Sequence, residues 1–149
     1  MKPQNILINK DGRAFVTDVG AAKEFKDTLV AKKRANMTSH GGTVKWMAPE
    51  MLQLYLTNKE IPAFLSNLDV FSLGLITLNA IDKDGFTKQK GLLNKDEKVL
   101  EKYLQELEAK GVIKDKEFFP ILKSMLSFNI DSRISIEKLY YWMVILFFQ

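Results

Sequence analysis

Two residues near the start of the chain, Asn5 and Asp18, carry oxygen atoms of the kind that bind hard divalent cations. An amide oxygen and a carboxylate oxygen suit Mg²⁺, which takes only one or two protein groups and completes its shell with water and phosphate oxygens. Asparagine and aspartate also serve in turns, where their side chains bond to the local backbone. The residue types therefore allow a magnesium site or two turn residues, and the fold must decide between them.

A hairpin is the element that would bring Asn5 and Asp18 together. Apolar residues alternate on both sides of Asp11-Gly12, and this dipeptide between two such runs is a strong signal for a two-residue hairpin turn. That turn predicts the facing pairs Lys10–Arg13, Ile8–Phe15, Ile6–Thr17 and Asn5–Asp18. Directly opposite residues have Cβ atoms about 4.5–5.5 Å apart. The expected register therefore places the amide and the carboxylate side by side.

Helical patterns occupy most of the chain after residue 46, at 47–56, 67–81, 95–110, 117–126 and 136–147. The segment 67–81 is apolar nearly all round, which predicts a helix buried on every side. Ser66 and Asp69 are expected to cap its start, and Gly111 to stop the helix at 95–110. A polar loop is expected between these two helices, and a long functional loop over 23–42. The fold class expected is α+β, mainly α: one hairpin, a long loop and about five helices around a buried one.

Composition excludes several kinds of site. The 149 residues are 46% hydrophobic, which predicts a single unit with one sizeable core. There is no cysteine and only one histidine, His40, so disulfides, thiolate metal sites and histidine cages are excluded. The net charge of +4 is spread along the chain and indicates no nucleic-acid partner. No secretory signal is visible, and the apolar stretch 140–148 is far shorter than the roughly 20 residues of a membrane span. We expect an intracellular, cytoplasmic protein; its oligomeric state is not predicted.

Five segments resemble motifs of the protein kinase family, in the family's order and spacing and over essentially the whole chain. They are Lys2-Pro3-Gln4-Asn5 (the end of the catalytic loop), Asp18-Val19-Gly20 (the Asp-Phe-Gly triplet), Gly42 to Glu50 (ending in Ala-Pro-Glu), Asp69 to Gly74 (Asp-Val-Trp-Ser-Leu-Gly) and Asp131-Ser132-Arg133. The resemblance implies that residues 1–149 are a partial kinase domain, its C-terminal lobe.

The resemblance also implies a reaction, the transfer of the ATP γ-phosphate to protein hydroxyls. Asp18 and Asn5 would then hold Mg²⁺, with Gly20 completing the nucleotide-binding triplet, and Lys2 would offset charge at the γ-phosphate. Lysine at this position is typical of serine/threonine kinases rather than tyrosine kinases. The alternative for Lys2 is a solvated surface lysine.

Three residues of the loop before the Ala-Pro-Glu motif have implied roles. Thr43 resembles the threonine that bonds the catalytic aspartate and this lysine, although a plain turn threonine is the alternative. Thr38 and Ser39 lie where activating phosphates fall, and a phosphate there would order the loop by pairing with basic groups. Many exposed serines and threonines are never phosphorylated, so this expectation has an ordinary alternative too.

Three further residues have architectural roles by the same resemblance. Glu50 and Arg133 would form the ion pair that ties the end of the activation segment to the last helices. Removing one partner of such a pair, if it is buried, costs roughly 3–5 kcal/mol. Asp69 would bond the catalytic-loop backbone, in addition to capping its helix.

The sequence departs from the family pattern in ways that bear on activity. Val19 replaces a phenylalanine, which would weaken or rebuild its packing, and Phe71 conservatively replaces a tryptophan; neither change argues for an inactive enzyme. The base aspartate of the pattern would precede Lys2 by two positions, and the glycine-rich loop and the ATP-contacting lysine have no counterpart in these residues. We therefore expect a serine/threonine kinase whose isolated 149-residue piece is inactive and exposes apolar surface. The rival hypothesis is a non-catalytic, pseudokinase-like module that docks proteins through the activation segment and the helix at 95–110. The retained Lys2, Asn5 and Asp18 speak against it.

Overall fold

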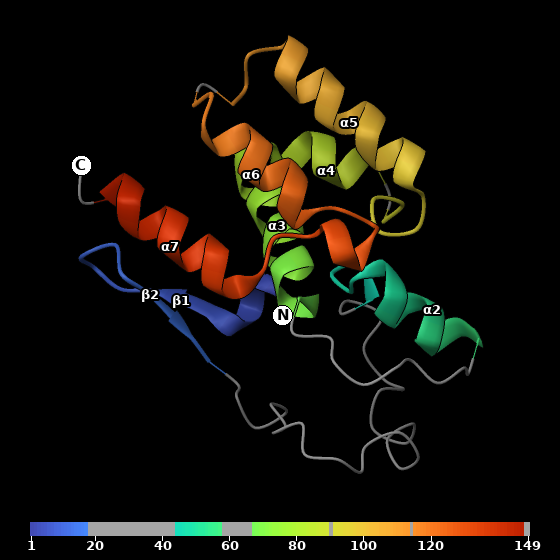
Figure 1. Ribbon diagram of the computed structural model, residues 1–149, viewed down its shortest axis with the longest axis horizontal. Helices are drawn as coiled ribbons and strands as arrows, with labels where there is room; N and C mark the ends of the chain where they lie inside the picture. The colour runs from blue at the N-terminus through green and yellow to red at the C-terminus, as the bar shows by residue number, and fades with distance from the viewer. Residues whose placement is uncertain (18–43, 58–66, 90, 114, 148–149) are drawn as a thin grey trace.

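The computed structural model describes residues 1–17, 44–57, 67–89, 91–113 and 115–147, and shows a helical body with one small sheet (Figure 1). The elements in chain order are η1 (Pro3–Asn5), β1 (Ile6–Ile8), β2 (Ala14–Val16), α2 (Pro49–Thr57), α3 (Leu68–Ile81), α4 (Lys83–Lys88), α5 (Glu97–Ala109), α6 (Phe118–Met125), η3 (Ile130–Ser132) and α7 (Ile136–Phe147). The mainly helical class with one antiparallel hairpin is as predicted.

The hairpin forms where expected, but its register differs by one residue from the prediction. The strands pair Ile6 with Val16, Leu7 with Phe15 and Ile8 with Ala14. The connecting loop therefore contains three residues, 10–12, rather than two. A three-residue loop with a left-handed residue at its end is the next most common hairpin connection, and Gly12 has a φ of +79°.

Asn9 supplies the physical reason for the longer loop. Its side-chain Oδ1 accepts hydrogen bonds from the backbone N–H groups of Asp11 at 3.0 Å and Arg13 at 2.9 Å. The Gly12 N–H donates to the Asn9 carbonyl at 3.1 Å. Asn9 thus accepts hydrogen bonds from three backbone N–H groups, which favours the three-residue loop over a two-residue turn.

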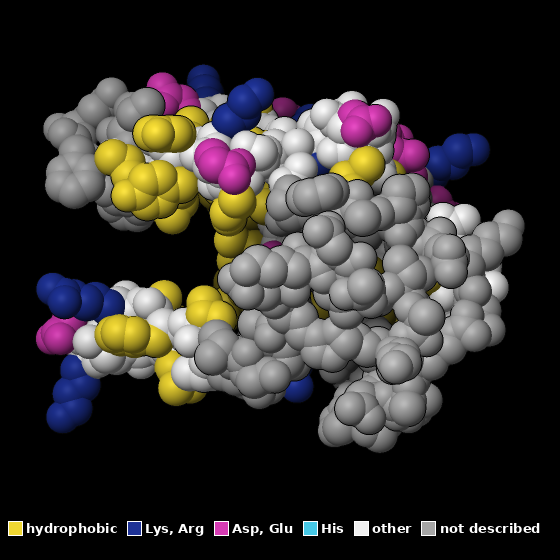
Figure 2. Space-filling model, turned by 60° about the horizontal axis from the view of Figure 1, so that its bottom comes forward, with side chains coloured by type: hydrophobic (Ala, Val, Ile, Leu, Met, Phe, Trp, Pro, Cys, Tyr) yellow, Lys and Arg dark blue, Asp and Glu magenta, His cyan; other side chains and the backbone are white. Residues whose placement is uncertain are grey.

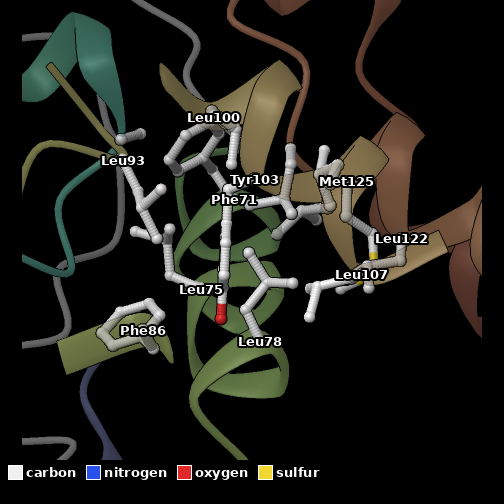
Figure 3. Packing of buried hydrophobic residues seen from close by; sticks show 14 of the residues in the cluster. Phe71, Leu75, Leu78, Phe86, Leu93, Leu100, Tyr103, Leu107, Leu122 and Met125 are labelled. Carbon is white, nitrogen blue, oxygen red and sulfur yellow. The ribbon is translucent and has the colours of Figure 1, made fainter. Parts of the chain in front are cut away.

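Helix α3 is the centre of the core, as its all-round apolar pattern predicts. Val70, Phe71, Leu75 and Leu78 are each at most 1% exposed. Figure 3 shows Phe71, Leu75 and Leu78 beside core residues from α4, α5 and α6. Gly74 permits this packing, because a Cβ there would lie 2.9 Å from the Leu126 side chain at the end of α6.

The start of α3 is not capped as predicted. Its N-cap position is Asn67, which makes no side-chain capping hydrogen bond. Asp69 lies in the first turn, where a carboxylate favours the helix dipole, and its Oδ1 contacts the Met1 nitrogen instead of the helix backbone. Ser66 lies outside the described residues.

Helix α4 replaces part of the polar loop predicted after α3, so the described residues contain six α-helices instead of about five. Asp82 caps it, since its Oδ1 accepts from the Gly85 N–H at 2.9 Å. Phe86, 6% exposed, faces the core. The helix is only six residues long and contains a glycine, so its propensity is weak and tertiary packing decides it.

The remaining helices match their predicted positions closely. Helix α7 has the predicted bounds, and α5 ends at Ala109, two residues before Gly111, whose φ is +61°. The N–H groups of Gly111 and Val112 bond the carbonyls of Glu108 and Leu107, which is the Schellman pattern. Within the described ranges, no helix combines the length and the apolar character that crossing a bilayer requires.

Apolar side chains are exposed on the hairpin and on α7. Ile8 is 70% exposed and Val16 58%, and Tyr140 and Tyr141 on α7 are exposed to a similar extent. Figure 2 shows apolar side chains on both sides of an open notch between the hairpin and α7. The exposed apolar area therefore lies on the hairpin and α7, whereas the core residues of α3 are buried.

Candidate functional site

The segment from Lys2 to Asn5 forms a single tight turn at the base of the hairpin. Pro3 starts the turn with its fixed φ, and the Asn5 N–H donates to the Lys2 carbonyl at 3.0 Å. The Thr17 N–H donates to the Asn5 carbonyl at 2.8 Å. The backbone of Asn5 is thus fixed on both sides.

The observed register removes the geometric argument for an Asn5–Asp18 pair. Thr17, not Asp18, lies opposite Asn5, and Asp18 is outside the described residues. The magnesium assignment consequently depends on the kinase motifs rather than on the predicted turn. This is the main correction to the sequence-based interpretation.

Asn5 nevertheless has the chemistry that one magnesium ligand requires. Its side chain is half-buried and makes no hydrogen bond to another described residue, so its amide oxygen is not consumed by a turn. Amide oxygens are hard ligands suited to Mg²⁺. Across the described ranges no group of three acidic or histidine side chains gathers to form a separate metal site.

Asp69 connects the Lys2–Asn5 turn to the central helix. Its Oδ1 lies 3.0 Å from the Met1 nitrogen, although 68 residues separate the two in sequence. The Asp69 side chain is 67% exposed, so this ion pair adds little to the stability of the fold. The structure thus brings the Asp69 carboxylate to the N-terminal ammonium group of Met1, beside the Lys2–Asn5 turn.

Glu50 and Arg133 meet in a buried bidentate pair. The two guanidinium nitrogens Nη1 and Nη2 lie 2.6 and 2.9 Å from Oε1 and Oε2 of the carboxylate. The Arg133 side chain is fully buried and that of Glu50 is 17% exposed. A parallel two-bond geometry of this kind is the strongest form of side-chain ion pair.

Two further N–H donors of Arg133 bind backbone carbonyls, which brings the number of its five donors in use to four. Its Nη1 donates to the Asn67 carbonyl at 3.1 Å and its Nε to the Ser127 carbonyl at 3.0 Å. The guanidinium lies 5.0 Å from the centre of the Phe71 ring, a cation–π distance. One side chain therefore joins α2, the start of α3 and the segment after α6.

Five predicted site residues lie outside the described residues: Asp18, Gly20, Thr38, Ser39 and Thr43. Their roles stay predictions. Of the other predicted site residues, the structure brings Glu50 to Arg133 and Asp69 to the backbone beside Lys2, and it makes no direct link between these two groups.

Sequence reasoning missed a second polar contact, between the α4–α5 connection and the segment before α2. Asn94 is 1% exposed, and its Nδ2 donates to the carbonyls of Val44 at 2.9 Å and Met47 at 2.8 Å. The sequence gives no sign of this role, because Asn94 lies in a polar run that is typical of a loop.

Sequence reasoning also missed the buried pair of Tyr103 and Asp82. The Tyr103 hydroxyl donates to Asp82 Oδ2 at 3.1 Å, and Figure 3 shows this side chain extending along α3 from α5. Burial, followed by the hydrogen bond to Asp82 and the charges of Asp82 and Glu106, raises the pKa of Tyr103 well above its ordinary value. Asp82 thus caps α4 and binds α5 at the same time.

A pocket of about 620 Å³ lies against η3 and the first turn of α7. Its lining includes Ser124, Asp131, Ser135 and Lys138, and also Arg133 of the buried ion pair. Neither Lys2 nor Asn5 lines it, so this pocket is separate from the Lys2–Asn5 turn.

Comparison with known proteins gives one family. The model of the family described as "Protein kinase domain" matches residues 1–142. No solved structure matches the chain.

Curated relatives are kinases that are much longer than this chain. The serine/threonine-protein kinase SKM1 of Saccharomyces cerevisiae is 31% identical over 146 residues, which cover 93% of this chain and 19% of the relative. A probable serine/threonine-protein kinase of Dictyostelium discoideum is 31% identical over 103 residues, covering 68% and 20%. The serine/threonine-protein kinase BCK1/SLK1/SSP31 of Saccharomyces cerevisiae is 36% identical over 78 residues, covering 52% and 5%. The chain therefore spans a fifth or less of the length of these relatives.

Proposed function

Because the chain belongs to the protein kinase family, we propose that it is the C-terminal lobe of an enzyme that transfers the γ-phosphate of ATP to serine and threonine hydroxyls of proteins. The observation that carries the proposal is the family match over 142 residues, which includes the Lys2–Asn5 turn and the Glu50–Arg133 pair. The three relatives reported above are named serine/threonine kinases, which supports serine and threonine rather than tyrosine as the residues that receive the phosphate.

Three residues that the structure describes, Lys2, Asn5 and Asp69, have a part in this proposal. Asn5, together with Asp18, would hold Mg²⁺, which neutralises charge on the ATP phosphates when it is bound. Lys2 would place its ammonium near the γ-phosphate and favour the charge that develops during transfer. The tight η1 turn sets the backbone of Asn5 relative to Lys2, and the carboxylate of Asp69 on α3 lies beside the turn, 3.0 Å from the Met1 nitrogen.

The 149 residues by themselves are expected to be inactive. They include Lys2 and Asn5 but no aspartate two positions earlier to accept the proton of the substrate hydroxyl. They also include no glycine-rich loop to cover the phosphates. Incubation of the purified chain with Mg²⁺-ATP and a protein substrate should therefore give no phosphate transfer, and measurable turnover would contradict this part of the proposal.

The positive test supplies the missing parts from a relative. The N-terminal lobe of the SKM1 kinase, up to and including its catalytic aspartate, is joined to Met1, and phosphate transfer to serine/threonine and tyrosine peptide mixtures is measured. We expect transfer to serine and threonine only. A completed protein that binds ATP but transfers no phosphate would favour the non-catalytic docking module.

Matched variants of the completed enzyme separate chemistry from folding. Lys2→Ala should lower kcat at least about a hundredfold, whereas Lys10→Ala, at the exposed hairpin turn, should leave it unchanged. Asn5→Ala should abolish Mg²⁺-dependent transfer. Asn9→Ala removes the hairpin-loop hydrogen bonds, which lie four residue pairs from Asn5, so it measures the effect of loosening the hairpin alone.

A further inference from the structure

The segment Val44–Met47 packs against α4 and against the connection between α4 and α5. Trp46, 3% exposed, stacks on Phe86 of α4 with ring centres 5.2 Å apart and an angle of 11°. The Nζ atom of Lys45 lies over the Trp46 ring, 4.7 Å from its centre. The stacking fixes the position of the indole but leaves the backbone carbonyls on either side of it to be satisfied by another group.

Asn94 satisfies those carbonyls. Its Nδ2 donates to Val44 O and Met47 O, one residue on each side of Lys45-Trp46. The two carbonyls are 50 and 47 residues away in sequence, so one amide group bridges the turn from outside. The turn has only one backbone hydrogen bond of its own among the described contacts, from the Met47 N–H to the Val44 carbonyl at 3.2 Å. Its shape therefore depends on Asn94.

Two polar atoms at this junction are buried without a hydrogen-bond partner in the described part of the chain, Trp46 Nε1 and Asn94 Oδ1. A junction made for stability alone would be filled by apolar groups, because an unpaired buried polar atom is costly. The asparagine is thus better explained by the geometry that its two donors impose on the turn than by the stability that it adds.

We propose that Asn94 is a positioning residue for the protein substrate: it fixes the turn Val44–Met47 at the end of the activation segment, and so sets the affinity for the substrate without taking part in phosphate transfer. This inference rests on the proposed function, because the turn docks a substrate only if the chain is part of a kinase. Lys45 is the exposed residue of the turn, and Val44 and Met47 are half-buried.

The first test measures the turn in the 149-residue chain itself. Asn94→Leu keeps the branched shape and removes both donors, and Asn94→Asp does the same with an acid. Hydrogen exchange, read by mass spectrometry, should become at least about tenfold faster in the peptide that contains Met47, and stay unchanged in peptides from α3. Gln105→Leu and Gln105→Glu, on the exposed face of α5, are the matched controls. Unchanged exchange at Met47 in both Asn94 variants would overturn the proposal, as would faster exchange throughout the chain in both variants.

The second test separates positioning from chemistry in the enzyme completed with the SKM1 lobe. Asn94→Leu should raise KM for the peptide substrate about tenfold and leave kcat and KM for ATP within twofold. An equal fall in kcat, or an unchanged KM, would overturn the role of Asn94 in substrate affinity. Failure of the completed wild-type enzyme to transfer phosphate would overturn the proposed function and the substrate role together, while the exchange experiment still decides whether Asn94 fixes the turn.

Discussion

The guanidinium group of Arg133 binds the carboxylate of Glu50 through two parallel hydrogen bonds of 2.6 and 2.9 Å, across 83 residues of sequence. Because the arginine side chain is fully buried, no water replaces the carboxylate when the pair is broken. The pair is therefore the strongest polar connection between the segment around α2 and the C-terminal helices in the described part of the chain.

Glu50→Gln should lower the free energy of unfolding by roughly 3–5 kcal/mol, because it leaves a buried cation without its counter-charge. Urea denaturation followed by circular dichroism measures the change. Glu108→Gln breaks the exposed pair with Lys123, whose side chains are 56% and 46% exposed, and should cost less than about 1 kcal/mol. A similar loss of unfolding free energy in Glu50→Gln and Glu108→Gln would contradict the idea that burial makes the Glu50–Arg133 pair important.

The hairpin register is open to a direct test by cross-linking, since the chain contains no cysteine. Ile6→Cys with Val16→Cys places the thiols in a directly opposite pair, and we expect rapid formation of a disulfide under mild oxidation. Ile6→Cys with Thr17→Cys tests the predicted register. It should form the bond slowly or not at all, because residues 6 and 17 point to opposite faces. Mass spectrometry reads both, and faster bond formation in the second pair would restore the two-residue turn.

The raised pKa of Tyr103 predicts a loss of stability at alkaline pH. The neutral phenol is favoured in the fold, so its contribution is complete below the ordinary pKa of 10.0 and is lost as the pH rises towards the raised value. Above pH 10 the free energy of unfolding should fall by up to about 1.4 kcal/mol per pH unit. Tyr103→Phe should flatten this fall, whereas Tyr140→Phe, at an exposed tyrosine of α7, should not. Urea denaturation of the wild type and the two variants at pH 8 and pH 11 measures the fall in each protein, and equal falls in Tyr103→Phe and wild type would refute the assignment.

The apolar surface around the notch predicts self-association of the isolated chain. Ile8→Thr with Val16→Thr keeps strand propensity while removing exposed apolar area, so it should reduce binding of the dye ANS and shift sedimentation towards the monomer. Leu56→Thr, at an exposed residue of α2 that is 68% accessible, is the control and should change little. An unchanged sedimentation profile in the hairpin variant would mean that this surface does not drive association.

The local elements of this protein were largely readable from its sequence. The apolar patterns of α3, α5, α6 and α7 recur within three or four residues, and each pattern is a property of neighbours along the chain. The order of five motifs indicated the kinase family, which the family comparison confirms over residues 1–142.

The tertiary structure alone decided the contacts that position the candidate site. The hairpin register is an exception, because it depends on a local contact that the predicted two-residue turn overlooked: Asn9 binds N–H groups two and four residues on, and Thr17 therefore lies opposite Asn5. Burial of Phe86 in the core makes a helix of a segment with weak propensity. Asn94 reaches Val44 and Met47 across about 50 residues, and Asp69 reaches Met1 across 68. Hydrogen bonds over such separations leave no periodic trace in the sequence, because their energy depends on where the packed helices bring two side chains rather than on the residues beside them.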